Sequence, residues 1–139
     1  MSYEEKGVWA YLISSASAYA AYLTIVVPRL SRVPAAQVSY VVPLLVTTVV
    51  SVVISTVVRT VLEAARPSDS RKADVRDREI ARFGEHASRW CVVGGAAVGF
   101  FMALRQWDYF WIANVIYLGF VLWAVVGSVL RLVAYRRGL

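Results

Sequence analysis

The sequence contains a single cysteine and a single histidine, and both are too isolated to form the usual reactive or metal-binding sites. One cysteine, Cys91, excludes an intrachain disulfide and paired-cysteine redox chemistry. His86 has no second histidine or cysteine close to it, so a zinc-like ligand set is absent. The chain also lacks a phosphate-binding glycine loop and a nucleophile with a matching base. We therefore expect no metal and no cofactor, and enzyme activity is disfavoured, although membrane enzymes can assemble sites across helices or subunits.

Charge is also missing from the middle of every long apolar run. Small proton-coupled pumps and most ion relays depend on an ionisable group inside the membrane, which is kept there only for function. This absence disfavours proton-coupled export. A transporter built from this chain has to work with hydroxyl, amide and aromatic groups.

The apolar residues, by contrast, are abundant and gathered in four blocks. Of 139 residues, 59% are hydrophobic and 17% are charged, which is unusual for a soluble domain. Uncharged runs of 22, 26, 15 and 22 residues follow Lys6, Arg32, Arg89 and Asp108. A helix needs about 20 apolar residues to cross a bilayer. We predict an all-α polytopic membrane protein, a four-transmembrane-helix bundle forming one domain over residues 1–139, with spans at about 8–27, 37–58, 88–105 and 109–131.

The third run is short for a span, and the charged segment before it, residues 59–88, offers an explanation. Apolar and small residues recur from this segment into the run at three- and four-residue intervals, at Ile80, Phe83, Gly84, Ala87, Trp90, Cys91 and Gly94. Such spacing is typical of one helix face. We expect a single helix over about 71–104, extended from the membrane into the cytoplasm.

The basic residues predict the orientation. If the N-terminus is cytoplasmic, the inside holds Lys6, eight residues between positions 59 and 89, and three arginines after position 130, which makes 12; the outside holds only Arg29, Arg32 and Arg105. Basic residues prefer the cytoplasmic side. We expect a multi-pass cell-membrane protein with both termini in the cytoplasm. The net charge of +6 indicates contact with the anionic inner leaflet, and no direct nucleic-acid binding is expected.

Several polar residues lie inside the predicted spans. Thr47, Ser51 and Ser55 repeat every four residues and share one helix face. This stripe either lines a polar cavity or makes hydrogen bonds to neighbouring helices and to its own backbone. The costliest group to bury is Asn114, which should find a partner on another helix, in that stripe or elsewhere, and set helix register. Tyr117 lies one turn after it.

Gly95 and Gly99 form a GxxxG spacing in the third span. Two small residues four apart allow close approach of another helix. That helix belongs either to a second copy of the chain, in a homo-oligomer, or to the same bundle.

The densest group of charges precedes the third span and comprises Asp74, Arg76, Asp77, Arg78, Glu79, Arg82, Glu85 and His86. On a helix, pairs four apart such as Asp74 with Arg78, and Glu85 with Arg89, are placed to form ion pairs. Three interpretations stay open: a clasp that holds the bundle, a docking surface for a cytosolic protein, or a ligand site.

Residues 74–85, together with 111–120 and 133–138, resemble a family of small bacterial four-span membrane proteins of unknown function. The resemblance covers about the second half of the chain. The loop of that family typically reads Asp-Glu-Arg-Asp, where this chain has Val75 as the second residue, and tyrosine is more usual at the position of His86. The resemblance implies the same fold and a cytoplasmic charged loop. Members are sometimes encoded beside helix-turn-helix regulators, which implies a regulatory partnership.

These observations predict a non-enzymatic membrane protein, regulatory or scaffolding, that self-associates and uses the charged helix to dock a partner or to clasp the bundle. Two alternatives remain. One is a small oligomeric transporter or channel, and the other is a lipid-binding membrane protein.

Overall fold

The computed structural model describes residues 3–65 and 75–137, with the backbone alone at positions 3 and 76. This part forms α1 (Tyr3–Leu30), the short 3-10 helix η1 (Ala35–Gln37), α2 (Val41–Ala64), α3 (Val75–Leu104) and α4 (Tyr109–Arg137). Each of the four α-helices is long and apolar enough to span a membrane. At about 1.5 Å per residue they are longer than a bilayer core of about 30 Å. The predicted all-α, four-span fold is therefore confirmed.

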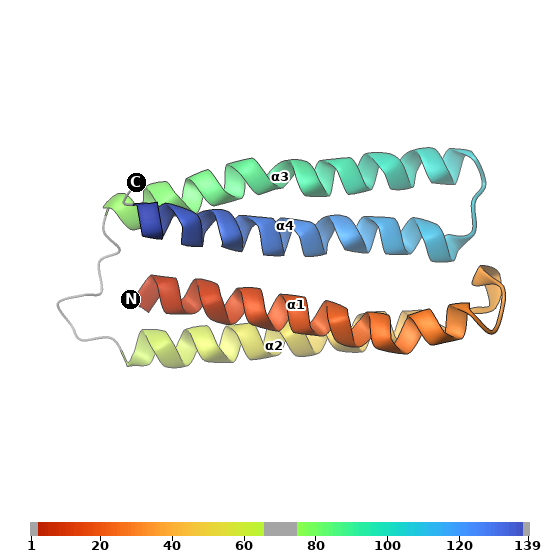
Figure 1. The fold of residues 1–139 in the computed structure, drawn as a ribbon, viewed down its shortest axis with the longest axis horizontal. Coiled ribbons are helices and arrows are strands. Elements are labelled where there is room, and N and C mark those ends of the chain that lie inside the picture. Colours follow the sequence, from red (N-terminus) through yellow and green to blue (C-terminus); the bar gives the residue numbers. More distant parts are fainter. Residues whose placement is uncertain (1–2, 66–74, 138–139) are drawn as a thin grey trace.

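The helices run up and down in chain order, so both chain ends lie at one end of the molecule (Figure 1). We name this the terminal end, and the opposite one, where α1 connects to α2 and α3 to α4, the hairpin end. α3 packs along α4, α4 also packs along α1, and α1 packs along α2. No residue of α2 is buried. α2 and α3 are therefore the outer members of the arrangement.

The third helix is continuous through the charged segment and the short apolar run, as predicted, from Val75 to Leu104. The predicted contact face was partly wrong. Ile80 and Ser88 are buried against the rest of the chain, whereas Phe83 and Trp90 are 52% and 69% exposed. Small residues occupy the side that faces α4 because they allow the two backbones to come close, and the large aromatic rings are left to face outward.

Helix ends show why the remaining boundaries fall where they do. α2 begins at Val41, later than the expected position 37. Pro43 is its third residue, in the first turn, where a missing N–H breaks no helical hydrogen bond. At the hairpin end α3 closes with Gln106 at φ 56° and with a hydrogen bond from Trp107 N to Met102 O. This left-handed residue reverses the chain into α4.

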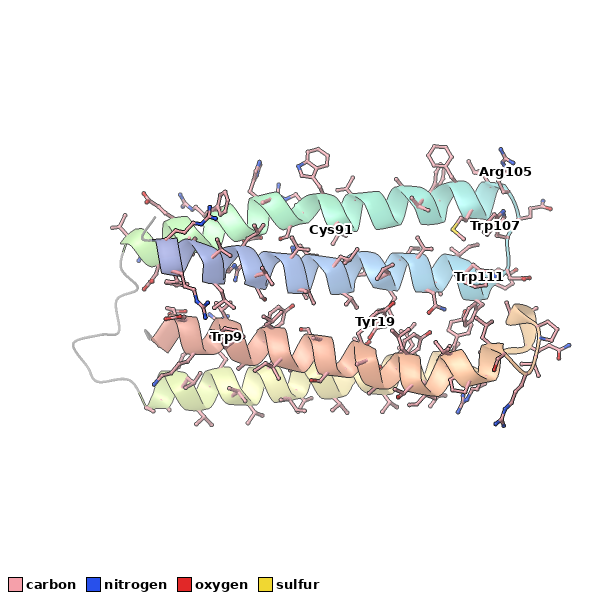
Figure 2. All side chains as sticks on the ribbon, viewed as in Figure 1. Trp9, Tyr19, Cys91, Arg105, Trp107 and Trp111 are labelled. Carbon is pink, nitrogen blue, oxygen red and sulfur yellow. The ribbon has the colours of Figure 1, made fainter. Side chains whose placement is uncertain are left out.

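A cluster of buried hydrophobic residues lies between α1, α4 and the segment before α2, toward the hairpin end. Its buried residues are Tyr22, Val26, Val38 and Phe110. Tyr19 projects from α1 toward α4 beside them (Figure 2). Arg105, Trp107 and Trp111 lie at the hairpin end (Figure 2), where the interfacial anchors of a membrane protein are expected.

Candidate functional site

At the terminal end all four helices border one cavity of about 500 Å³. This volume falls within the range of small-molecule sites, about 300–1,000 Å³. Its charged lining residues come from every helix and are Glu4, Arg59, Glu63, Glu85 and Arg131. Its Ser and Thr lining residues are Ser55, Thr56, Ser88 and Ser128. Because α2 is packed along α1 and α3 along α4, the cavity lies between two helix pairs.

Arg131 reaches the cavity across a glycine of the neighbouring helix. A Cβ atom at Gly84 would lie 2.5 Å from Arg131 Cγ and 3.0 Å from Nε, so the arginine stem occupies the space that a side chain would need. Arg131 Nε is buried and has no hydrogen-bond partner in the described part of the chain. An unsatisfied buried donor costs about 1–3 kcal/mol. The Arg131 stem is therefore packed over Gly84 with its Nε enclosed by protein.

The other charged groups of the cavity differ in their pairing. Arg59 Nε lies 2.9 Å from Glu63 Oε1, one turn along α2, and both side chains of this ion pair are exposed. Glu85 is exposed on α3, and the expected ion pair with Arg89 is not formed within the described residues. Glu85 therefore lines the cavity as an exposed residue.

A polar contact joins α3 to α4 next to the cavity. Tyr135 Oη donates a hydrogen bond of 3.0 Å to Asp77 Oδ1 across 58 positions of sequence. Asp77 is only partly exposed, whereas its neighbours Arg78 and Glu79 are exposed. Asp77 therefore contacts α4 through a tyrosine, and we name this hydrogen bond the clasp.

The remaining members of the charged cluster point away from α4. Arg78, Glu79, Arg82 and His86 are all exposed. Asp74 and the side chain of Arg76 lie outside the described residues. Three or more potential metal ligands do not come together anywhere in residues 3–65 and 75–137. In α3 the Asp77 carboxylate therefore contacts α4, whereas these four charged residues are exposed.

The hydroxyl stripe of α2 is divided between two environments. Thr47 and Ser51 line an apolar groove of about 630 Å³ between α1 and α2, whereas Ser55 lines the terminal-end cavity. Thr47 donates to Pro43 O and Ser55 to Ser51 O, at 2.8 and 2.7 Å. Ser55 Oγ also lies 2.7 Å from Ser14 Oγ on α1. Most of the donors in this stripe are therefore spent within its own helix.

Asn114 finds its partner on α1 rather than in that stripe. Tyr22 Oη donates to Asn114 Oδ1 at 2.6 Å. The Tyr117 ring meets Tyr19 and Tyr22 edge-on, with centroids 5.7 and 5.3 Å away. Such aromatic pairs prefer this geometry. Asn114 and Tyr117 therefore hold α4 against α1 and do not face the cavity.

The GxxxG pair packs inside the chain. A Cβ at Gly95 would lie 2.9 Å from Gly119 Cα, and one at Gly99 would lie 2.7 Å from Ile116 Cγ1. Both glycines therefore contact α4, and this face of α3 is occupied without a second copy of the chain.

Sequence reasoning missed three residues that the structure places at these contacts: Tyr22, Arg131 and Tyr135. Each acts through a partner more than 40 positions away, which a single sequence does not reveal. The available signal was weaker. Arg131 is the first charge after the 22-residue run of the fourth span, and intramembrane or interfacial charges mark functional positions.

Comparisons of this chain with family models, curated proteins and solved structures found no match. Membership of the four-span family therefore stays a prediction. The chain is described by its fold, a four-span membrane protein.

Proposed function

We propose that this chain is a non-enzymatic membrane protein, regulatory or scaffolding, that holds an acidic cytosolic protein on the outer face of α3. The observation that carries this proposal is a row of arginines. Arg78, Arg82 and Arg89 are four and seven residues apart, so they fall within about 40° of one another around the helix. All three are exposed. We name them the arginine row.

The row is separated from the parts of α3 that hold the fold. Ile80, on the opposite side of the helix, is buried, and Asp77, about 120° around the helix from the row, is bonded to Tyr135. Guanidinium groups in a line are well suited to carboxylates, which they bind in a forked geometry. Glu85 is seven residues from Arg78 and so lies on the same side of the helix, but the three guanidinium groups outnumber it. An acidic helix or loop therefore matches the row in net charge. The positive-inside distribution of Lys and Arg supports a cytoplasmic location for it.

Site-specific photocrosslinking in cells tests the proposal. A photoreactive residue replaces His86, which is exposed beside the row, and a second chain carries it at Phe101, which is 65% exposed on the same helix. We expect a discrete protein adduct at position 86 and none at position 101. Adducts to lipid alone at position 86 would show that the row rests on anionic headgroups.

Charge reversal of the arginine row provides a second test of the proposal. Arg78→Glu with Arg82→Glu should remove most of the adduct, because attraction becomes repulsion. The matched control is Arg136→Glu with Arg137→Glu, two exposed arginines at the end of α4. Asp77 is left unchanged because its reversal would break the contact with Tyr135. Equal adduct yields from both pairs would count against a role for the row.

A further inference from the structure

The groove of about 630 Å³ between α1 and α2 has one side of small residues and one side of branched residues. It runs from Ala10 to Ala21 on α1 and from Val46 to Val58 on α2. On α1, five of the six lining residues are Ala or Ser, whereas on α2 five of the six are Val, Ile or Thr. The short side chains of α1 therefore leave a hollow beside the longer ones of α2.

The groove begins at the charged edge of the two spans and stops near the middle of the membrane. At the terminal end, Ala10 lies one turn after Lys6, the last charge before the first apolar run. On the other helix, Val58 directly precedes Arg59, the first charge after the second run. From Ala10 to Ala21 the groove is about 17 Å long at the rise of an α-helix. Half of a bilayer core is about 15 Å, so the groove is about as long as one leaflet is deep.

The groove requires no polar group from its occupant. Ser14 Oγ lies 2.7 Å from Ser55 Oγ, across the α1–α2 contact, and Thr47 donates to a carbonyl of its own helix at 2.8 Å. Ser17 and Ser51 lie within helices, where a hydroxyl can bond the carbonyl of the preceding turn. An apolar occupant supplies the dispersion contacts that an empty groove would lack.

We propose that this groove holds one acyl chain of a phospholipid from the leaflet at the terminal end, with the headgroup at the charged edge. The length of the groove favours a chain, because a lipid chain also ends near the midplane. A helix of a second copy that packed lengthwise would cross both leaflets, but the groove does not continue past Ala21. From there to the hairpin end α1 exposes larger residues, Leu23, Ile25 and Val27.

Native mass spectrometry of the full chain, released from mild detergent with added phosphatidylglycerol, tests the proposal. We expect one phospholipid to stay bound after loosely held lipid has been removed. Ser17→Leu with Ala21→Leu places two larger side chains in the groove and should lower this retention about tenfold, because the chain loses its contacts. The matched control is Ala16→Leu with Ala20→Leu, two exposed α1 residues with the same spacing that do not line the groove.

Thermal unfolding of both double variants verifies the fold. Equal lipid retention by the two folded variants would overturn the proposal. A dimer of the parent chain that only the Ser17 and Ala21 pair of substitutions dissociates would also overturn it and assign the groove to a second copy.

A photoreactive lipid tests the same site in the unchanged protein. A phosphatidylglycerol with a diazirine at the end of one acyl chain should crosslink mainly near Ala21 and Val46, where the groove ends at the midplane. Crosslinks spread evenly over the exposed faces of α2 and α3 would show that no chain is held in the groove.

Discussion

Tyr22 of α1 donates a hydrogen bond of 2.6 Å to Asn114 Oδ1 of α4. Asn114 Nδ2 in turn donates to Phe110 O at 2.8 Å, so both ends of the amide are satisfied. Tyr22 has no exposed surface. This side-chain pair therefore joins α4 to α1, beside the ring contacts of Tyr117 with Tyr19 and Tyr22.

Removing this bond should weaken the association of α1 with α4. Tyr22→Phe keeps the ring but leaves Asn114 Oδ1 without its donor, and we expect a loss of about 0.5–1.5 kcal/mol, the range found for hydrogen bonds between membrane helices. Reversible unfolding in mixed lipid and detergent micelles measures it. Tyr109→Phe is the control because Tyr109 is 85% exposed. If Tyr22→Phe costs no more than Tyr109→Phe, the bond does not hold α1 against α4.

Two adjacent glycines of α3 should respond in opposite ways to alanine. A Cβ at Gly95 would lie 2.9 Å from Gly119 Cα, a backbone atom, whereas at Gly94 it would meet nothing within 4 Å. Gly95→Ala should destabilise the protein by about 1–3 kcal/mol, as overpacking does. Gly94→Ala should be neutral or slightly stabilising, since alanine favours helix. The same unfolding measurement compares them, and equal effects would contradict the close α3–α4 contact.

The clasp between α3 and α4 should protect the first turns of α3 from opening. Tyr135→Phe removes the donor to Asp77 at a cost of about 1 kcal/mol, because the pair is partly solvated. We expect faster hydrogen exchange over residues 75–84 and unchanged exchange over 95–104 in the same helix. Uniform exchange along α3 in the variant and the parent would argue that the clasp contributes nothing.

The orientation of the four spans can be tested with single cysteines in a Cys91→Ala background. Gln106→Cys, at the hairpin end, should react with a membrane-impermeant maleimide in intact cells. His86→Cys should react only after the membrane is opened, because the 12 to 3 distribution of basic residues predicts that the terminal end faces the cytoplasm. The reverse labelling pattern would invert the topology.

Much of the fold was predictable because it depends on local composition. Long apolar runs and the requirement for internal hydrogen bonding in lipid lead to spanning helices, and the continuity of α3 followed from spacing alone. The face of α3 did not. A spacing of three to four residues fits both the helix face that carries Trp90 and the face that carries Ser88. Only the small residues of α4, such as Gly119 and Gly127, decide which of the two faces packs against α4.

The candidate site was less predictable because its contacts are long-range. The sequence showed the charged cluster around Asp77. It did not show that Asp77 pairs with Tyr135, which lies 58 positions away. Arg131 was visible as a basic residue at the end of a span, but its importance depends on the absence of a side chain at Gly84. Such pairings require either a structure or related sequences.

The packing of neighbouring helices also bears on how the protein is made. α1 with α2, and α3 with α4, are antiparallel pairs formed by consecutive segments, and the main contact between the pairs is that of α4 with α1. Each pair can therefore enter the bilayer from the translocon as a closed unit while its backbone groups are already satisfied. The terminal-end cavity is lined by residues of both pairs, so it is complete only when the two pairs have met.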